Sequence, residues 1–79
     1  MPRPTPDLKV LGSVLRGFRQ KKGWTQEKLY LKTGLATPLV SGGENGARNL
    51  SFDTLERWLR GLGVSWAEFG RAIDETSVS

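Results

Sequence analysis

Apolar residues recur at helical spacing in short segments along the chain, and glycines separate one segment from the next. β-branched residues are scattered and form no alternating run of useful length, so strands are not expected. We expect helices over about residues 8–22, 25–34, 37–46, 51–63 and 65–74. The pattern therefore predicts an all-α fold of five short helices.

Residues that favour helix ends lie at the borders of these segments. Thr25 and Ser51 are predicted N-caps. Thr37 is also a predicted N-cap, followed by Pro38 at the first helical position. The glycine pair 42–43 falls inside the third helix, where each glycine costs roughly 1 kcal/mol relative to alanine.

The 79 residues are expected to form one domain. The tail of residues 1–7 alternates proline and is predicted to be extended. The domain itself is predicted to cover residues 8–74, and the polar residues 75–79 are expected to fray.

Composition excludes several classes of function. Cysteine and histidine are both absent, which removes disulfides, the commonest metal ligands and the commonest general base. We therefore expect no metal, no cofactor and no enzymatic activity. No apolar run approaches the roughly 18 residues of a membrane span, and no signal peptide precedes the domain, so a cytoplasmic protein without membrane contact is expected.

Charge is uneven along the chain. Residues 1–50 hold nine Lys/Arg and three Asp/Glu, a net charge of +6, whereas residues 51–79 hold three and five, a net charge of −2. A basic half is suited to a polyanion such as nucleic acid, although solubility alone explains the charge equally well.

Residues 25–46 carry the most informative spacing, because one short helix is followed by a second across a turn at Gly34. In a helix-turn-helix the first helix crosses the phosphate backbone and the second lies in the major groove. Glycine tolerates the positive φ that such a turn needs. Free backbone amides at the start of the helix predicted over residues 25–34, together with the side chain of Gln26, offer hydrogen-bond donors to phosphate.

An ordered set of short motifs spans about residues 10–70. It comprises Leu11-Gly12, Leu15-Arg16 with Arg19, Lys22–Leu29, Thr33-Gly34-Leu35, Val40-Ser41, Glu44-Asn45-Gly46, Arg48-Asn49, Ser51, Leu55 and Leu62–Ser65. This set resembles the Cro/C1-repressor (Xre-type) helix-turn-helix family. The resemblance implies a compact, five-helix, lambda-repressor-like DNA-binding domain with the helix-turn-helix in the second and third helices.

The resemblance also implies roles for individual residues. Gln26 matches the residue that anchors the sugar-phosphate backbone, and Arg19 and Glu44 match a partly buried ion pair between the first and third helices. The positions that match groove-facing residues are Thr37, Pro38, Ser41 and Gly42. The positions that match phosphate-contacting loop residues are Asn45, Arg48 and Asn49.

The chain departs from the family at two core positions. The family usually has a small residue where this chain has Tyr30, and isoleucine or leucine where it has Gly43. We expect a compensating exchange, in which the Tyr30 ring occupies the space vacated at Gly43, because exchanges that conserve volume are tolerated best in packed cores.

The expected groove-facing residues are poorly suited to distinguish one base from another, since specific base contacts favour long polar side chains. Three explanations are open: readout of DNA shape, readout by other side chains such as Arg48 or the tail residue Arg3, or a domain that now binds protein. The aromatic residues Phe18, Phe52 and Trp58 are expected in the core. The later apolar residues Trp66, Phe69 and Ile73 are expected either to bury in a homodimer or to close the core.

Together these features predict a transcriptional regulator that binds double-stranded operator DNA as a homodimer. It would act by occluding promoter DNA or by contacting RNA polymerase. Its short length and the junction at residues 48–51 also resemble restriction-modification controller proteins, although small phage and antitoxin-type regulators share these features. The alternative is a protein-interaction module on the same fold with a degenerate recognition helix.

Overall fold

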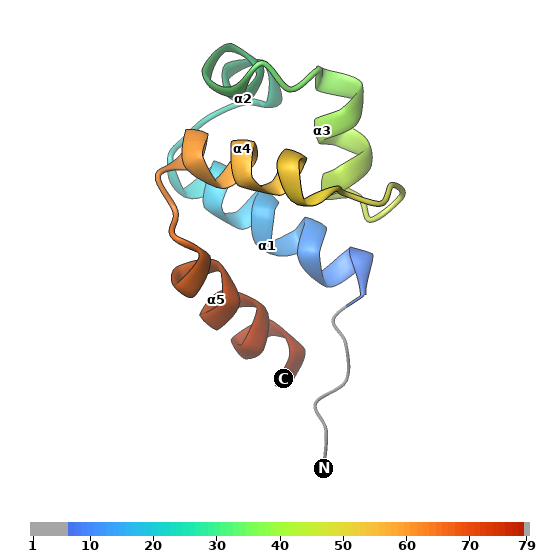
Figure 1. The fold of residues 1–79 in the computed structure, drawn as a ribbon, viewed down its shortest axis with the longest axis vertical. Coiled ribbons are helices and arrows are strands. Elements are labelled where there is room, and N and C mark those ends of the chain that lie inside the picture. The colour runs from blue at the N-terminus through green and yellow to red at the C-terminus, as the bar shows by residue number, and fades with distance from the viewer. Residues whose placement is uncertain (1–6, 79) are drawn as a thin grey trace.

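Five helices and no strand make up the part of the chain that the structure describes, residues 7–78 of a computed structural model, with side chains described for residues 7–76 (Figure 1). The helices are α1 (Leu8–Lys21), α2 (Gln26–Thr33), α3 (Thr37–Glu44), α4 (Phe52–Leu62) and α5 (Trp66–Val78). The predicted all-α fold of five short helices is confirmed. None of the described helices is both long and apolar enough to cross a membrane.

Local side-chain chemistry sets most helix starts. Thr25 caps α2 by accepting a hydrogen bond from the amide N of Lys28 at 3.0 Å, and Ser51 caps α4 by accepting one from the amide N of Thr54 at 3.1 Å. Both predicted N-caps are confirmed. Such a bond satisfies one of the amides that a helix start leaves without a partner.

Two predicted borders are wrong. The N-cap of α3 is Ala36 rather than Thr37, because the carbonyl O of Ala36 already accepts a hydrogen bond from the amide N of Val40 at 3.0 Å. Pro38 is consequently the second helical residue. At the other end of the chain, α5 continues to Val78, beyond the expected helix end at residue 74.

The core is built from all five helices. Fully buried side chains come from each of the first four, and Phe69 of α5 is 4% exposed. The largest fully buried side chains are Trp58, Leu15, Leu29, Leu59, Leu62 and Val40. Figure 1 shows α2 and α3 at one end of the molecule and α5 at the other, with α1 and α4 between them.

Two glycines allow close approaches that position α2 and α3. A methyl group at Gly12 would lie 2.5 Å from the carbonyl O of Glu44, so the backbones of α1 and α3 touch directly. A methyl group at Gly61 of α4 would overlap the side chain of Thr33 on α2. Since backbone atoms cannot move aside by changing rotamer, any larger residue at position 12 would push α1 and α3 apart.

The expected exchange between Tyr30 and Gly43 is wrong. Tyr30 is 46% exposed and lies away from the core. A Cβ at Gly43 would meet Cζ3 of Trp58 at 3.0 Å and Cδ2 of Leu50 at 3.1 Å. The space beside Gly43 is therefore filled by the indole of α4 and by the chain that precedes α4.

Candidate nucleic-acid interface

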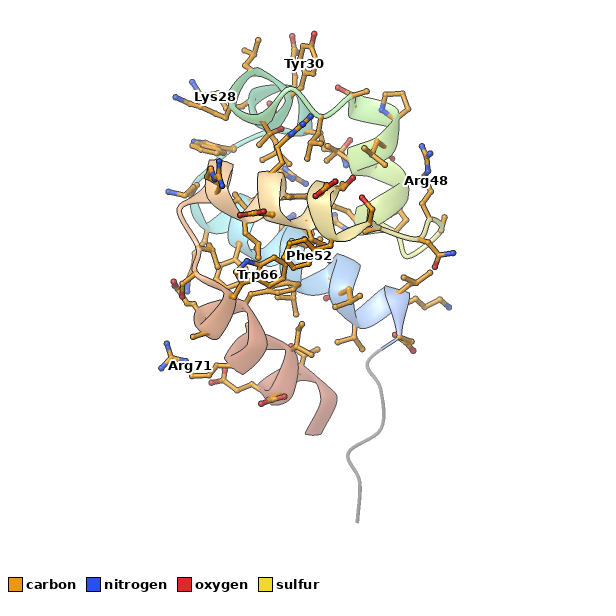
Figure 2. All side chains as sticks on the ribbon, in the orientation of Figure 1. Lys28, Tyr30, Arg48, Phe52, Trp66 and Arg71 are labelled. Carbon is orange, nitrogen blue, oxygen red and sulfur yellow. The ribbon has the colours of Figure 1, made fainter. Side chains whose placement is uncertain are left out.

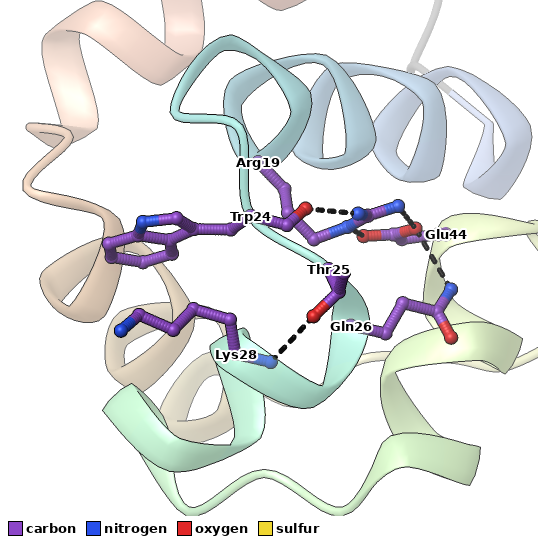
Figure 3. A network of polar contacts seen from close by, with 6 residues as sticks. All are labelled: Arg19, Trp24, Thr25, Gln26, Lys28 and Glu44. Atoms are coloured by element: carbon purple, nitrogen blue, oxygen red, sulfur yellow. Dashed lines mark hydrogen bonds and ion pairs between the residues drawn. The ribbon is translucent and has the colours of Figure 1, made fainter.

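A buried ion pair joins α1 to the end of α3 (Figure 3). Nε of Arg19 donates to Oε2 of Glu44 at 2.6 Å, and a second guanidinium nitrogen donates to Oε1 at 2.9 Å. The third nitrogen donates to the carbonyl O of Trp24 at 2.6 Å, just before α2 begins. This is the ion pair that the sequence predicts, and its third bond also ties down the start of α2.

The environment of Arg19 favours its charged form. The hydrogen bonds to Glu44 raise the pKa of Arg19, burial lowers it by a smaller effect, and the charge of Glu44 raises it further. The net direction is upward. All three guanidinium nitrogens of Arg19 donate a hydrogen bond, and both carboxylate oxygens of Glu44 accept one, which is the condition for a stable buried ion pair.

Gln26 belongs to the same network. Its Nε2 donates to Oε1 of Glu44 at 3.1 Å, so the first side chain of α2 is tied to the last residue of α3 (Figure 3). A primary amide has two donors and one acceptor oxygen. One N–H and the oxygen are thus not used by this bond. The predicted role of Gln26 at a phosphate stays a prediction.

The predicted groove positions lie along one helix. Thr37 and Pro38 are exposed at the start of α3, and Ser41 and Gly42 are half-buried one turn later. Asn45 and Asn49 are exposed in the loop that follows α3. The predicted groove and loop positions thus lie on α3 and on the loop that directly follows it, and Gln26 reaches the last residue of α3. Arg3 lies outside the described residues.

Arg48 leaves this loop and lies against α3. A methyl group at Gly42 would fall 2.6 Å from Cδ and 2.8 Å from Cγ of Arg48, so the aliphatic stem of the arginine occupies the place of a side chain at position 42. Figure 2 shows Arg48 alongside the outer side of α3. The sequence singled out both residues and gave no sign that they touch.

Two lysines lie near the ring of Trp24, which sequence reasoning did not single out as a site. Nζ of Lys22 lies 5.2 Å from the centre of the Trp24 ring, and Nζ of Lys32 lies 5.9 Å from it. Cations over an indole face are attracted by its quadrupole. The ammonium groups of Lys22, before α2, and of Lys32, near its end, therefore lie beside the same ring.

An exposed aromatic pair lies at the starts of α4 and α5. Phe52 is 66% exposed and stacks on Trp66, which is 42% exposed, with ring centres 5.1 Å apart. The expectation that Phe52 lies in the core is wrong. Phe69 is buried and closes the core, with its ring edge-on to Trp66 at 6.1 Å, and Ile73 packs partly buried against the core. We call Phe52 and Trp66 the aromatic pair.

Known proteins share both the sequence pattern and the fold. The helix-turn-helix family matches residues 15–69. An uncharacterised HTH-type transcriptional regulator of Sinorhizobium fredii, y4dJ, is 37% identical over 68 residues, which cover 86% of this chain and 88% of that protein.

Solved structures give the same picture. The restriction-modification controller protein C.Esp1396I, a tetramer in complex with its natural 35 base-pair operator, is 33% identical, with a TM-score of 0.86 over 91% of this chain and 95% of that chain. The controller protein C.AhdI of Aeromonas hydrophila is 34% identical, with a TM-score of 0.75 over 78% of this chain and 94% of that chain. With this match in sequence and fold, the chain belongs to the Cro/C1-repressor (Xre-type) helix-turn-helix family.

Proposed function

We propose that this protein is a transcriptional regulator that binds operator DNA as a homodimer. The observation that carries the proposal is the exposed face of α3, which Arg48 extends and which the Arg19–Glu44–Gln26 network fixes relative to α2. A helix placed in this way fits the major groove while the preceding helix crosses the backbone. The relatives include a controller protein in complex with its operator.

Contacts to DNA divide into two kinds in this proposal. Gln26, Asn45 and Asn49 donate hydrogen bonds to phosphates and set the register on the duplex, while Thr37 and Pro38 offer methyl or ring carbon to a thymine methyl. Ser41 bonds to either kind of base edge. Because phosphate neutralisation dominates affinity, binding should fall steeply as salt rises.

The aromatic pair is the proposed dimer surface, and its occupant is a second copy of this chain. Large exposed aromatic side chains are costly in water and are enriched at protein interfaces. The solved relatives include a controller protein that forms a tetramer on its operator. A two-fold axis near this surface leaves both copies of α3 free, and we place them about one DNA turn apart, roughly 34 Å.

Regulation in this proposal follows from occupancy of the operator. The bound dimer covers promoter DNA or contacts RNA polymerase from beside it. Both actions take place where bacterial promoters are, in the cytoplasm. The proposal assigns no catalytic step to the chain.

Selection from a randomised duplex pool at near-physiological salt tests the proposal. We expect enrichment of a pseudo-palindrome whose half-sites are about one helical turn apart. Retention without an enriched motif would reduce the function to backbone binding. If the folded protein retains no duplex, the DNA-binding proposal is wrong, and a protein-interaction module on this fold becomes the better description.

A further inference from the structure

The loop after α3 is fixed in place by its backbone. Gly46 has a φ of 72°, and a methyl group there would lie 2.8 Å from Cα of Lys9, so the loop packs directly on the start of α1. The amide N of Ala47 donates to the carbonyl O of Gly42 at 2.9 Å. Arg48 therefore starts from a held backbone position next to Gly42.

The side chain of Arg48 can follow α3 only because position 42 has no Cβ. Two of its methylene carbons, Cγ and Cδ, lie within 2.8 Å of the place that a Cβ would take. Carbon atoms in contact are about 3.5–4.0 Å apart, so a methyl group at 42 and this conformation of Arg48 exclude each other. Arg48 is exposed, and it can leave α3 without disturbing the core.

We propose that Gly42 is a specificity-determining position that acts through Arg48, by leaving the space in which the arginine stem crosses α3. This inference rests on the proposed function. Arg48 then supplies the long, bidentate donor that α3 itself lacks, since its other groove positions are Thr37, Pro38 and Ser41. Gly42 is a positioning residue, and the group that meets DNA is the guanidinium of Arg48.

The chain supplies a matched control for this idea. Gly17, inside α1, has no atom within 4 Å of the place of a Cβ, whereas Gly42, in the last turn of α3, has the stem of Arg48 there. Replacing a glycine by alanine inside a helix removes backbone freedom from the unfolded chain and favours folding. Gly17→Ala and Gly42→Ala should therefore both fold at least as stably as the parent, and only Gly42→Ala should move Arg48.

The experiment measures the affinity of each variant for the enriched duplex and for a scrambled duplex of the same length, both at the same salt concentration. We expect Gly42→Ala to lower the ratio of the two affinities about tenfold, the size of one lost bidentate base contact. Gly17→Ala should leave the ratio unchanged. Arg48→Ala should lower the ratio to a similar extent, and adding Gly42→Ala to it should cause no further loss.

The outcomes separate the inference from the function on which it rests. If the parent enriches no motif, the proposed function and the inference both fail. If the parent is selective and Gly42→Ala behaves like Gly17→Ala, the inference alone is wrong. It is also wrong if the losses from Gly42→Ala and Arg48→Ala multiply in the double variant, because the glycine would then act independently of the arginine.

Discussion

Trp58 fills the space beside Gly43, and this contact decides which residue position 43 can hold. Cζ3 and Cη2 of the indole would lie 3.0 and 3.1 Å from a Cβ there, and Leu50 blocks the other side at 3.1 Å. The indole is fully buried and cannot move without opening the core. A larger residue at 43 must therefore strain the packing between α3 and α4.

Gly43→Ile is expected to destabilise the domain by about 1–3 kcal/mol, the usual cost of overpacking a core. Tyr30→Ala removes a half-exposed ring and should cost less. Because the two residues fill different spaces, the double variant should show the sum of the single effects. Urea denaturation of all four proteins measures this, and recovery of stability in the double variant would contradict the packing seen here.

The buried carboxylate of Glu44 gives a second prediction at this scale. Glu44→Gln leaves Arg19 buried without its counter-charge, and removing one partner of a buried pair costs about 3–5 kcal/mol. The matched control is Glu56→Gln, which breaks the exposed pair with Arg60 at 3.0 Å and should cost about 0.5 kcal/mol or less. Thermal denaturation compares the two, and equal losses would rule out a structural role for the buried pair.

The pKa direction of Arg19 also fixes how the pair responds to pH. A raised pKa in the folded protein adds stability that is complete below the ordinary arginine value and is lost only as pH rises through the folded value. The stability that Arg19 adds through this pair is thus independent of pH throughout the neutral range. We expect the difference between parent and Glu44→Gln to show no arginine-derived change between about pH 6 and 9 in denaturation measurements.

Among the helices, α3 has the weakest start. Its N-cap, Ala36, makes no side-chain hydrogen bond, whereas Thr25 and Ser51 cap α2 and α4 with their hydroxyls. Pro38 has no amide hydrogen to be capped, which leaves Leu39 as the amide that a cap would reach. Helix α3 therefore depends on its packing more than α2 and α4 do.

Ala36→Ser is expected to stabilise the domain by about 0.5–1 kcal/mol, because the backbone of Ala36 is already extended, with φ −58° and ψ 141°, and a hydroxyl there can accept from Leu39. Ser51→Ala, the opposite change at α4, should cost a similar amount. Chemical denaturation of both variants checks the signs. A loss of stability in Ala36→Ser would show that the start of α3 has no room for a cap.

The helix borders show what sequence patterns can predict. Thr25 and Ser51 were predictable because a cap acts within four residues. The border at Thr37 was not, since a residue before proline is pushed away from helical geometry and so resembled a cap.

The contact between Gly42 and Arg48 depends on the path of a loop that packs on α1, and no local pattern encodes that path. Likewise Phe52 has the spacing of a core residue but is 66% exposed, and it stacks on the ring of Trp66, which is itself 42% exposed.

The whole molecule separates its two proposed surfaces. Figure 2 shows Arg48 beside α3, whereas Phe52 and Trp66 lie between α4 and α5. A variant that disrupts one surface should therefore leave the other intact.

Trp66→Ser is expected to shift sedimentation of the protein from dimer to monomer at micromolar concentration. Leu31→Ser is the matched control, since Leu31 is 70% exposed on α2, outside the aromatic pair, and its loss should leave the dimer unchanged. On a duplex with a single half-site, Trp66→Ser should bind like the parent, and on the full pseudo-palindrome it should bind more weakly. An unchanged dimer would place the interface elsewhere.

The backbone contact at Gly12 has a mechanical consequence for the DNA. It leaves no side chain between the backbones of α1 and α3 at this point, and α5 packs directly on α1, so we expect α3 and α5 to move as one body. In the proposed dimer, two such bodies joined at the aromatic pair would hold their α3 helices at one fixed separation. Any mismatch with the operator must then be absorbed by elastic bending or twisting of the duplex, whose energy depends on base steps that the protein does not touch.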